Sequence, residues 1–399
     1  MRGNSRRTAL LAWAGILAAL AWNGPAGQQA CAYAGTGAAP GTTPTERVVA
    51  VKADRIDTVT SGVIQNGVIL IRGTKISEIG ANVTIPGTAE VIDVANRIIF
   101  PGLVGPISDI GISSGQRGGP ASRARYRVAD ELYPYQHEYR RALQAGFTTL
   151  GLIPRGQGVA GQGAIIRPSG RSREEMLLAE SGMIWIEFRA DGRIKDTIKR
   201  AMESAKNKDT SDDPDVAAMI RALQGKIPTF ISCARPADTI HLLDLLKERD
   251  KMKLVLVLGY ENYRIAERLT KEKVPVVLPA SIEFEMFTRT RINEADQLSR
   301  AGVQVACVPE SGGVEGLEDF RREMAELVKC GLDGQAARKA MTICPAEALG
   351  LDYRLGSLEK GKDANLLILD GDVLDATTTI QKIMVEGKIV YENPWEKSQ

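Results

Sequence analysis

Three polar side chains stand at the ends of strand-like runs. Asp109 follows the run LVGPIS, Ser232 ends the run PTFIS, and Glu310 follows VQVACVP. If these runs are parallel strands of one barrel, their carboxyl ends meet at one mouth, and Asp109 and Glu310 face each other there. Two carboxylates and a hydroxyl could bind a hard cation such as Mg²⁺ or Ca²⁺, or act as a general acid and base. The alternative is a pair of solvated polar residues without a function.

Histidine and cysteine offer little further chemistry. The chain has two histidines, and we expect a surface or helix-packing role for each, because His137 lies in the helical segment YPYQHEYRRAL and His241 in ADTIHLLDLL. The absence of a C-x-x-C motif excludes a zinc ribbon. Cys233 is a candidate nucleophile, but neither histidine has a context that makes it an obvious base. The cysteines after the N-terminal region are expected to be small buried thiols: Cys233, Cys307, Cys330 and Cys344.

The order of strand and helix patterns predicts the elements that position these residues. Beyond Arg171, short apolar runs alternate with amphipathic helical segments, which is typical of βα units that close into a parallel barrel. From Arg47 to Asp93, β-branched runs predict short antiparallel strands, with Asn66-Gly67 as a hairpin signal. The segment Gly156 to Gly170 lacks a Gly-Lys-Ser/Thr ending. It therefore predicts a tight loop and a returning strand, and not a phosphate-binding loop.

Composition and the N-terminal region indicate which partners and which cellular location to expect. The 399 residues include 51 Lys and Arg against 49 Asp and Glu, so the near-zero net charge argues against nucleic acid as a partner. Arginines precede an apolar stretch from Thr8 to Trp22, and Ala32-Tyr33-Ala34 is a plausible cleavage site. About 15 apolar residues are fewer than the roughly 20 that span a bilayer. We expect a cleaved signal peptide, export to the periplasm or the outside, and no membrane span in the mature protein.

Two stretches resemble the amidohydrolase superfamily of metal-dependent hydrolases. The seam IIFPGLVGPISDIG, from Ile98 to Gly111, is similar to the family's Pro-Gly-Leu-Ile-Asp-x-His-x-His. The tail from Ala337 to Asp372 contains CPAEALG and GSLEKGKDANLLI, which closely match the family's Asn-Pro-Ala and Gly-Ser-Leu-Glu-x-Gly-Lys-Asp-Ala-Asp-Leu motifs. The glycine-dense segment is similar to one in imidazolonepropionase-like members.

The resemblance implies an α/β fold: a TIM-like (β/α)8 barrel with a small β-sandwich formed by both ends of the chain. The expected parts are a signal peptide (1–34), a linker (35–46), the first part of the sandwich (47–100), the barrel (101–347), and the second part of the sandwich with the tail (348–399).

The family holds one or two divalent metal ions, usually zinc, and the resemblance places other residue types at its ligand positions. Those positions carry Ile107 and Asp109 for the first-strand histidines, Ser232 and Gly259 (Leu258 with a register slip of one) for the middle-strand histidines, and Glu310 for the last-strand aspartate. No segment convincingly matches the lysine that bridges two metals in many members. We therefore expect no metal and no other cofactor at the family's site, with Mg²⁺ or Ca²⁺ on the carboxylates as the alternative.

Three functions are open from the sequence. The first is an exported, catalytically degenerate amidohydrolase-like protein that retains its barrel pocket for binding or for a structural role. The second is an active hydrolase of carbon–nitrogen bonds that uses Asp109 and Glu310. The third is an extracytoplasmic module for a small molecule, in which Arg117, Arg123 and Arg125 of a long loop grip an anion. A small-molecule ligand is the expected partner.

Overall fold

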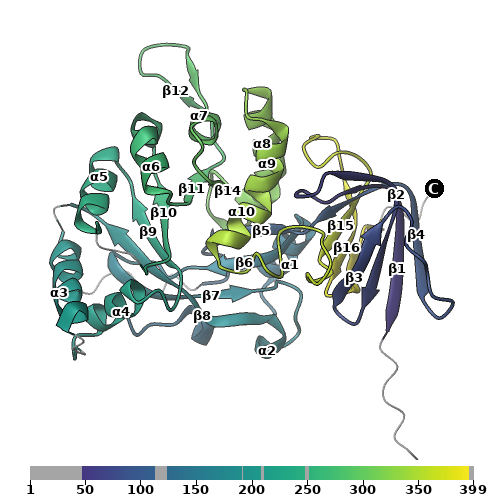
Figure 1. Cartoon of the computed structure of the whole chain (residues 1–399), viewed down its shortest axis with the longest axis horizontal. Coiled ribbons are helices and arrows are strands. Elements are labelled where there is room, and N and C mark those ends of the chain that lie inside the picture. The colour runs from purple at the N-terminus through teal and green to yellow at the C-terminus, as the bar shows by residue number, and fades with distance from the viewer. Residues whose placement is uncertain (1–46, 113–123, 191, 208–210, 248–250, 395–399) are drawn as a thin grey trace, which may run out of the picture. The chain divides into compact units, whose positions relative to one another are not determined.

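The computed structural model describes residues 47–112, 124–190, 192–207, 211–247 and 251–394 (Figure 1). The expected signal peptide and linker lie outside these ranges, and so do Arg117 and Arg123. Within the ranges, no helix is both long enough and apolar enough to cross a membrane.

One seven-stranded sheet is built from both ends of the described chain. Its order is β17 (Lys388–Glu392), β16 (Ile380–Val385), β15 (Leu366–Leu369), β4 (Glu90–Pro101), β1 (Val48–Asp57), β2 (Val63–Arg72) and β3 (Lys75–Gly80). β4 joins the two halves, because it pairs in parallel with β1 and antiparallel with β15. Alternate side chains such as Val51, Ile69, Ile99 and Ile368 form one apolar core.

The hairpin predicted at Asn66-Gly67 is wrong. β1 and β2 are joined by the turn that ends at Gly62, whose φ of 84° suits glycine. Asn66 lies inside β2 with a φ of 48°. Its neighbours Gln65 and Gly67 pair with Arg55 and Ala53 of β1, whereas Asn66 itself is not paired with β1. The Asn-Gly pair therefore marks an irregularity within β2. Asn adopts the left-handed backbone there, as it would in a turn.

The predicted seam joins the two sheets. β4 ends at Pro101, and β5 (Leu103–Ser108) begins the second sheet one residue later. Ile99 faces the core of the first sheet, whereas Phe100 packs into the core beneath the helices. A Cβ at Gly102 would collide with the side chain of Thr148, so only glycine fits where the chain passes between the sheets.

Eight strands form the second sheet. Their order is β14 (Val305–Val308), β11 (Val276–Pro279), β10 (Leu254–Leu258), β9 (Thr229–Cys233), β8 (Leu177–Phe188), β7 (Gly158–Ile166), β6 (Phe147–Leu152) and β5. The end strands β5 and β14 lie in contact, so the sheet is a nearly closed barrel and the predicted fold class is confirmed.

β7 alone departs from the parallel pattern, since it runs antiparallel to β6 and β8. Its connection to β6 is too short for the crossover that a parallel pair requires.

Helices lie around much of the barrel (Figure 1). They are η1 (Val128–Glu131), α1 (His137–Gln144), α2 (Arg173–Met176), α3 (Ile194–Asn207), α4 (Pro214–Leu223), α5 (Pro236–Leu245), η2 (Asn262–Ile265), α6 (Ala266–Glu272), α7 (Glu294–Arg300), α8 (Gly313–Lys329), α9 (Gly334–Met341) and α10 (Ile343–Ala348). A short hairpin of β12 (Glu283–Phe284) and β13 (Arg291–Ile292) precedes α7. Local signals set the starts of several helices: Asp213 caps α4 ahead of Pro214.

The barrel interior is a packed core and not an open pore. Apolar side chains point inward from successive strands and belong to one buried cluster. They include Trp185, Phe230, Val255 and Val277. Ala346 of α10 belongs to the same cluster and closes the amino-terminal end of the barrel. Chemistry is therefore confined to the other end, where the strands finish.

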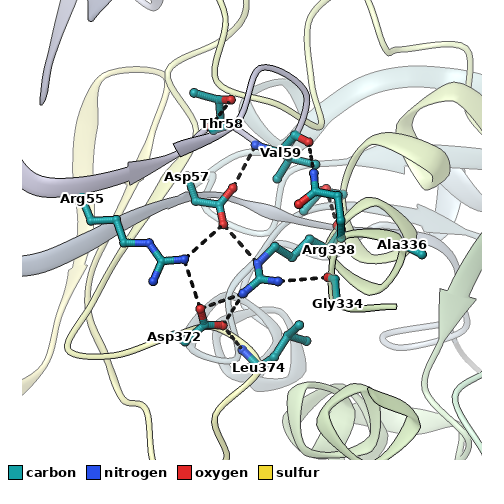
Figure 2. A network of polar contacts seen from close by, with 12 residues as sticks. Arg55, Asp57, Thr58, Val59, Gly334, Ala336, Arg338, Asp372 and Leu374 are labelled. Atoms are coloured by element: carbon teal, nitrogen blue, oxygen red, sulfur yellow. Dashed lines mark hydrogen bonds and ion pairs between the residues drawn. The ribbon is translucent and has the colours of Figure 1, made fainter. Parts of the chain in front are cut away.

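A partly buried ionic network ties α9 to the β-domain, the part of the chain that contains the seven-stranded sheet (Figure 2). Arg338 lies between two carboxylates, with its Nε 3.1 Å from Asp57 Oδ2 and its Nη2 2.7 Å from Asp372 Oδ2. Arg55 approaches Asp372 from the other side at 3.3 Å. The second oxygen of Asp57 accepts a hydrogen bond from the backbone N–H of Val59. The network joins the end of β1, the segment after β15 and helix α9.

Candidate functional site at the barrel mouth

Strand register defines the inward-facing residues at the mouth. Glu187 of β8, Ser232 of β9 and Val257 of β10 lie side by side. Each is two residues beyond an inward-facing apolar residue, so each points into the barrel at its carboxyl end. Ser232 is thus at the mouth, as expected, and its neighbour Cys233 faces the helical shell.

Glu187 is a mouth residue that sequence reasoning missed. The signal was available in the run WIEF, where Glu187 follows the inward-facing Trp185 at a spacing of two. Its Oε1 accepts a hydrogen bond of 3.1 Å from Arg189 Nη2.

Ile107 and Asp109 have become parts of other interactions. Ile107, at the end of β5, packs against the apolar interior of the barrel. Asp109 Oδ2 accepts a hydrogen bond from Nη2 of Arg155, a residue that follows β6. A guanidinium therefore supplies the positive charge beside this carboxylate.

Gly259 is a packing residue. A Cβ there would lie 2.5 Å from the carbonyl oxygen of Ala234, so the close approach of β9 and β10 requires glycine. Leu258, the alternative under a register slip, is buried toward the helices. Val257 is the β10 residue that faces the mouth, and it offers no donor atom.

Glu310 follows β14 and lies near the same seam as Asp109. A Cβ at Gly312 would come 3.9 Å from Asp109 Oδ1, which brings the two chain segments together. The electrostatic neighbours of Glu310 are nevertheless other acids, since it raises the pKa of both Glu283 and Glu323. Its backbone N–H donates to Glu323 Oε2 at 3.1 Å.

Charge is segregated around the mouth according to strand order. Arg155, Arg189 and Arg235 follow β6, β8 and β9, and each donates to a carboxylate. Their side chains are 56%, 62% and 68% exposed, so the guanidinium groups also face solvent. Exposed guanidinium groups, each paired with a carboxylate, therefore line one side of the mouth, which we call the basic side.

The opposite side of the mouth is acidic. Glu261, Glu283 and Glu310 follow the adjacent strands β10, β11 and β14. Burial raises the pKa of Glu283, and the negative charges of Glu261 and Glu310 raise it further. Glu294, the first residue of α7, belongs to the same group: its pKa is raised to about 7 by burial and by Glu283 and Glu261.

The remaining candidates lie elsewhere. His137 begins α1 and is exposed beside Glu138, and His241 is exposed on α5, as predicted. Burial raises the pKa of the Cys233 thiol to about 12, which opposes a nucleophilic role. The described cysteines are free thiols. Arg125 lines a cavity of about 320 Å³ with Gln162 and α4.

The residues that the resemblance places at the family's ligand positions do not fit a metal ion. Ile107 offers no donor atom, Gly259 has no side chain, and Asp109 is bound to Arg155. Across the described ranges, no three His, Cys, Asp or Glu side chains are grouped so that they could hold a metal ion.

Comparisons with known proteins agree with the fold. A model described as the amidohydrolase family matches residues 172–390. The crystal structure of an amidohydrolase from Thermotoga maritima MSB8 superposes with a TM-score of 0.75 at 24% identity, covering 86% of this chain and all of that one. Phenylurea hydrolase B gives a TM-score of 0.56 at 15% identity, covering 86% of this chain and 96% of that one.

A curated relative matches over a short stretch. Amidohydrolase tasK of Hapsidospora irregularis is 31% identical over 72 residues, which are 18% of this chain and only 7% of that protein.

Proposed function

We propose that this chain, which belongs to the amidohydrolase family, uses its barrel mouth to bind a small charged molecule and has lost the family's metal-dependent hydrolysis. The observation that carries this proposal is the pairing of Asp109 with Arg155. A guanidinium carries a permanent positive charge, so the carboxylate that would face a metal ion is already neutralised. A divalent ion at that place would have to displace the arginine.

The chemistry of the mouth supports binding. The guanidinium groups of Arg155, Arg189 and Arg235 are each more than half exposed, and a guanidinium has five N–H donors that match a carboxylate. Trp185 and Phe230 are buried in the core beneath the mouth. A small carboxylate that reached this side would meet several oriented donors.

Two assays on the purified protein test this proposal together. We expect glutarate to bind saturably in calorimetry and to raise the melting temperature. We expect no turnover of a panel of N-acyl amino acids and cyclic amides, with or without added zinc. Turnover that a chelator abolishes would overturn the proposal, and so would the lack of any glutarate binding.

The alternative is hydrolysis by Asp109 and Glu310 as base and acid, and the proximity of Asp109 to the segment after Glu310 is the observation in its favour. Against it, the Asp109 carboxylate is already bound by Arg155. Asp109→Ala and Glu310→Ala would each abolish turnover on this account. If turnover is found and neither substitution reduces it, this second function is excluded.

Export is a separate part of the proposal, supported by the arginines and the apolar stretch from Thr8 to Trp22. We expect the full chain to be shortened near Ala34 and recovered outside the cytoplasm. Mass spectrometry of the mature N-terminus after cell fractionation tests this. An intact N-terminus in the cytoplasmic fraction would contradict it.

A further inference from the structure

Glu294 is an unusual residue on the acidic side of the mouth. It is the first residue of α7, only 7% of its surface is exposed, and its Oε1 has no hydrogen-bond partner among the described residues. A buried carboxyl oxygen without a partner costs free energy, on the order of 1–3 kcal/mol. The position therefore requires an explanation.

The surroundings of Glu294 are negative. Its carboxyl accepts a hydrogen bond from the backbone N–H of Glu261. The negative charges of Glu261 and Glu283 repel a negative charge on Glu294 and so raise its pKa. Glu310 acts on Glu283 in the same way. Arg264 pairs with Glu261 at 3.3 Å, but both of these side chains are more than half exposed, which places the pair in solvent.

Two kinds of partner could satisfy such a cluster, and the geometry separates them. A bare metal ion requires several ligand atoms around one point, and no described group of acids has that arrangement. An ammonium or guanidinium group instead donates several directed hydrogen bonds to carboxylates that are spread apart.

We propose that Glu294, with Glu261, Glu283 and Glu310, forms a subsite for an organic cation, namely the primary ammonium or guanidinium group of a small ligand. The inference rests on the proposed function, because it assigns a chemical class to the acidic side of the same mouth. With the arginines opposite, a ligand that carries both an amine and a carboxylate could engage both sides.

Agmatine, which carries an ammonium and a guanidinium group and no carboxylate, is the probe. We expect calorimetry to show saturable binding at constant ionic strength, tighter at pH 8 than at pH 6, with release of a proton. Glu294→Gln keeps the shape and removes the charge, and we expect it to weaken agmatine binding at least tenfold without weakening glutarate binding. Glu283→Gln provides a second variant, should Glu294→Gln lower the yield of folded protein.

Glu347→Gln is the matched control. Glu347 is also a glutamate whose pKa is raised by burial and by a neighbouring acid, Asp352, but it lines a cavity of about 690 Å³ with Leu254 and Pro275 at the opposite end of the barrel. This variant is expected to bind agmatine as the parent protein does.

The outcomes separate the two proposals. Absent agmatine binding, or binding that Glu294→Gln and Glu283→Gln leave intact, overturns the cation subsite, and glutarate binding would then still support the proposed function. Chelator-sensitive turnover together with Glu294-dependent agmatine binding would overturn the proposed function and leave the subsite standing.

Discussion

Single side chains set the charges at the mouth of this barrel. Asp109 and Arg155 follow neighbouring strands, and their contact places a fixed charge pair beside the carboxylates of the last strand. Asp109 was identifiable from the sequence, because the seam motif fixes its place. Arg155 was not, since no local pattern distinguishes a guanidinium that pairs across two strands from one in solvent.

Arg155→Ala tests the basic side of the mouth. Because Arg155 is 56% exposed, its pair with Asp109 contributes little to folding, and we expect the free energy of unfolding to fall by less than about 1 kcal/mol. Glutarate affinity, in contrast, should fall about tenfold, which is about 1.4 kcal/mol. Calorimetric titration measures it. Arg322→Ala, at an exposed pair on α8, is the control and should leave the affinity unchanged.

Glu294 should make stability depend on pH. Burial raises its pKa from 4.5 to about 7, so between these values the folded state binds more protons than the unfolded chain. The free energy of unfolding should therefore fall as pH rises through this interval, by on the order of 3 kcal/mol from this group.

Glu294→Gln, which cannot ionise, should match the parent protein at pH 4.5 and exceed its stability at pH 8. Urea unfolding at several pH values measures this difference. Glu285→Gln, at an exposed position of the β12–β13 hairpin, serves as the control. Equal pH slopes for the parent protein and Glu294→Gln would contradict the assignment.

At the scale of elements, the connection between the β-domain and α9 depends on Arg338. Asp57 is 4% exposed, and its Oδ2 faces Arg338 at 3.1 Å. Arg338→Ala would leave a buried carboxylate without its main partner, which costs about 3–5 kcal/mol. We expect urea unfolding to show a loss of that order. Arg338→Lys should recover only part of it, because an ammonium cannot reach both Asp57 and Asp372 as the planar fork does. A loss below about 1 kcal/mol would contradict this account.

Helices and strands were predictable where apolar residues recurred at regular spacing or where proline and glycine marked a boundary. The alternation of strand and helix after Arg171 and the seam at Pro101-Gly102 indicated the barrel and its junction. The reversal of β7 and the place of the first hairpin were not predictable, because Asn66-Gly67 suits a strand irregularity as well as a turn. The acidic side of the mouth was missed for a similar reason. Glu261, Glu283 and Glu294 are separated in sequence and meet only through strand order.

At the scale of the whole molecule, residues 46–399 form one compact unit. A single apolar core contains Leu103 and Leu143 of the barrel region together with Leu367 and Ile383 of the β-domain. Because this core is shared, we expect one cooperative transition in scanning calorimetry, with equal calorimetric and van't Hoff enthalpies. Two resolved transitions would show that the β-domain and the barrel are separately stable.

We propose that this chain lacks the family's metal site. Elemental analysis of protein produced in zinc-supplemented medium and purified without chelators tests this proposal. We predict divalent metal far below one ion per chain, and no gain in melting temperature when Zn²⁺, Mn²⁺ or Mg²⁺ is added. One or two divalent ions per chain that survive dialysis would contradict the account.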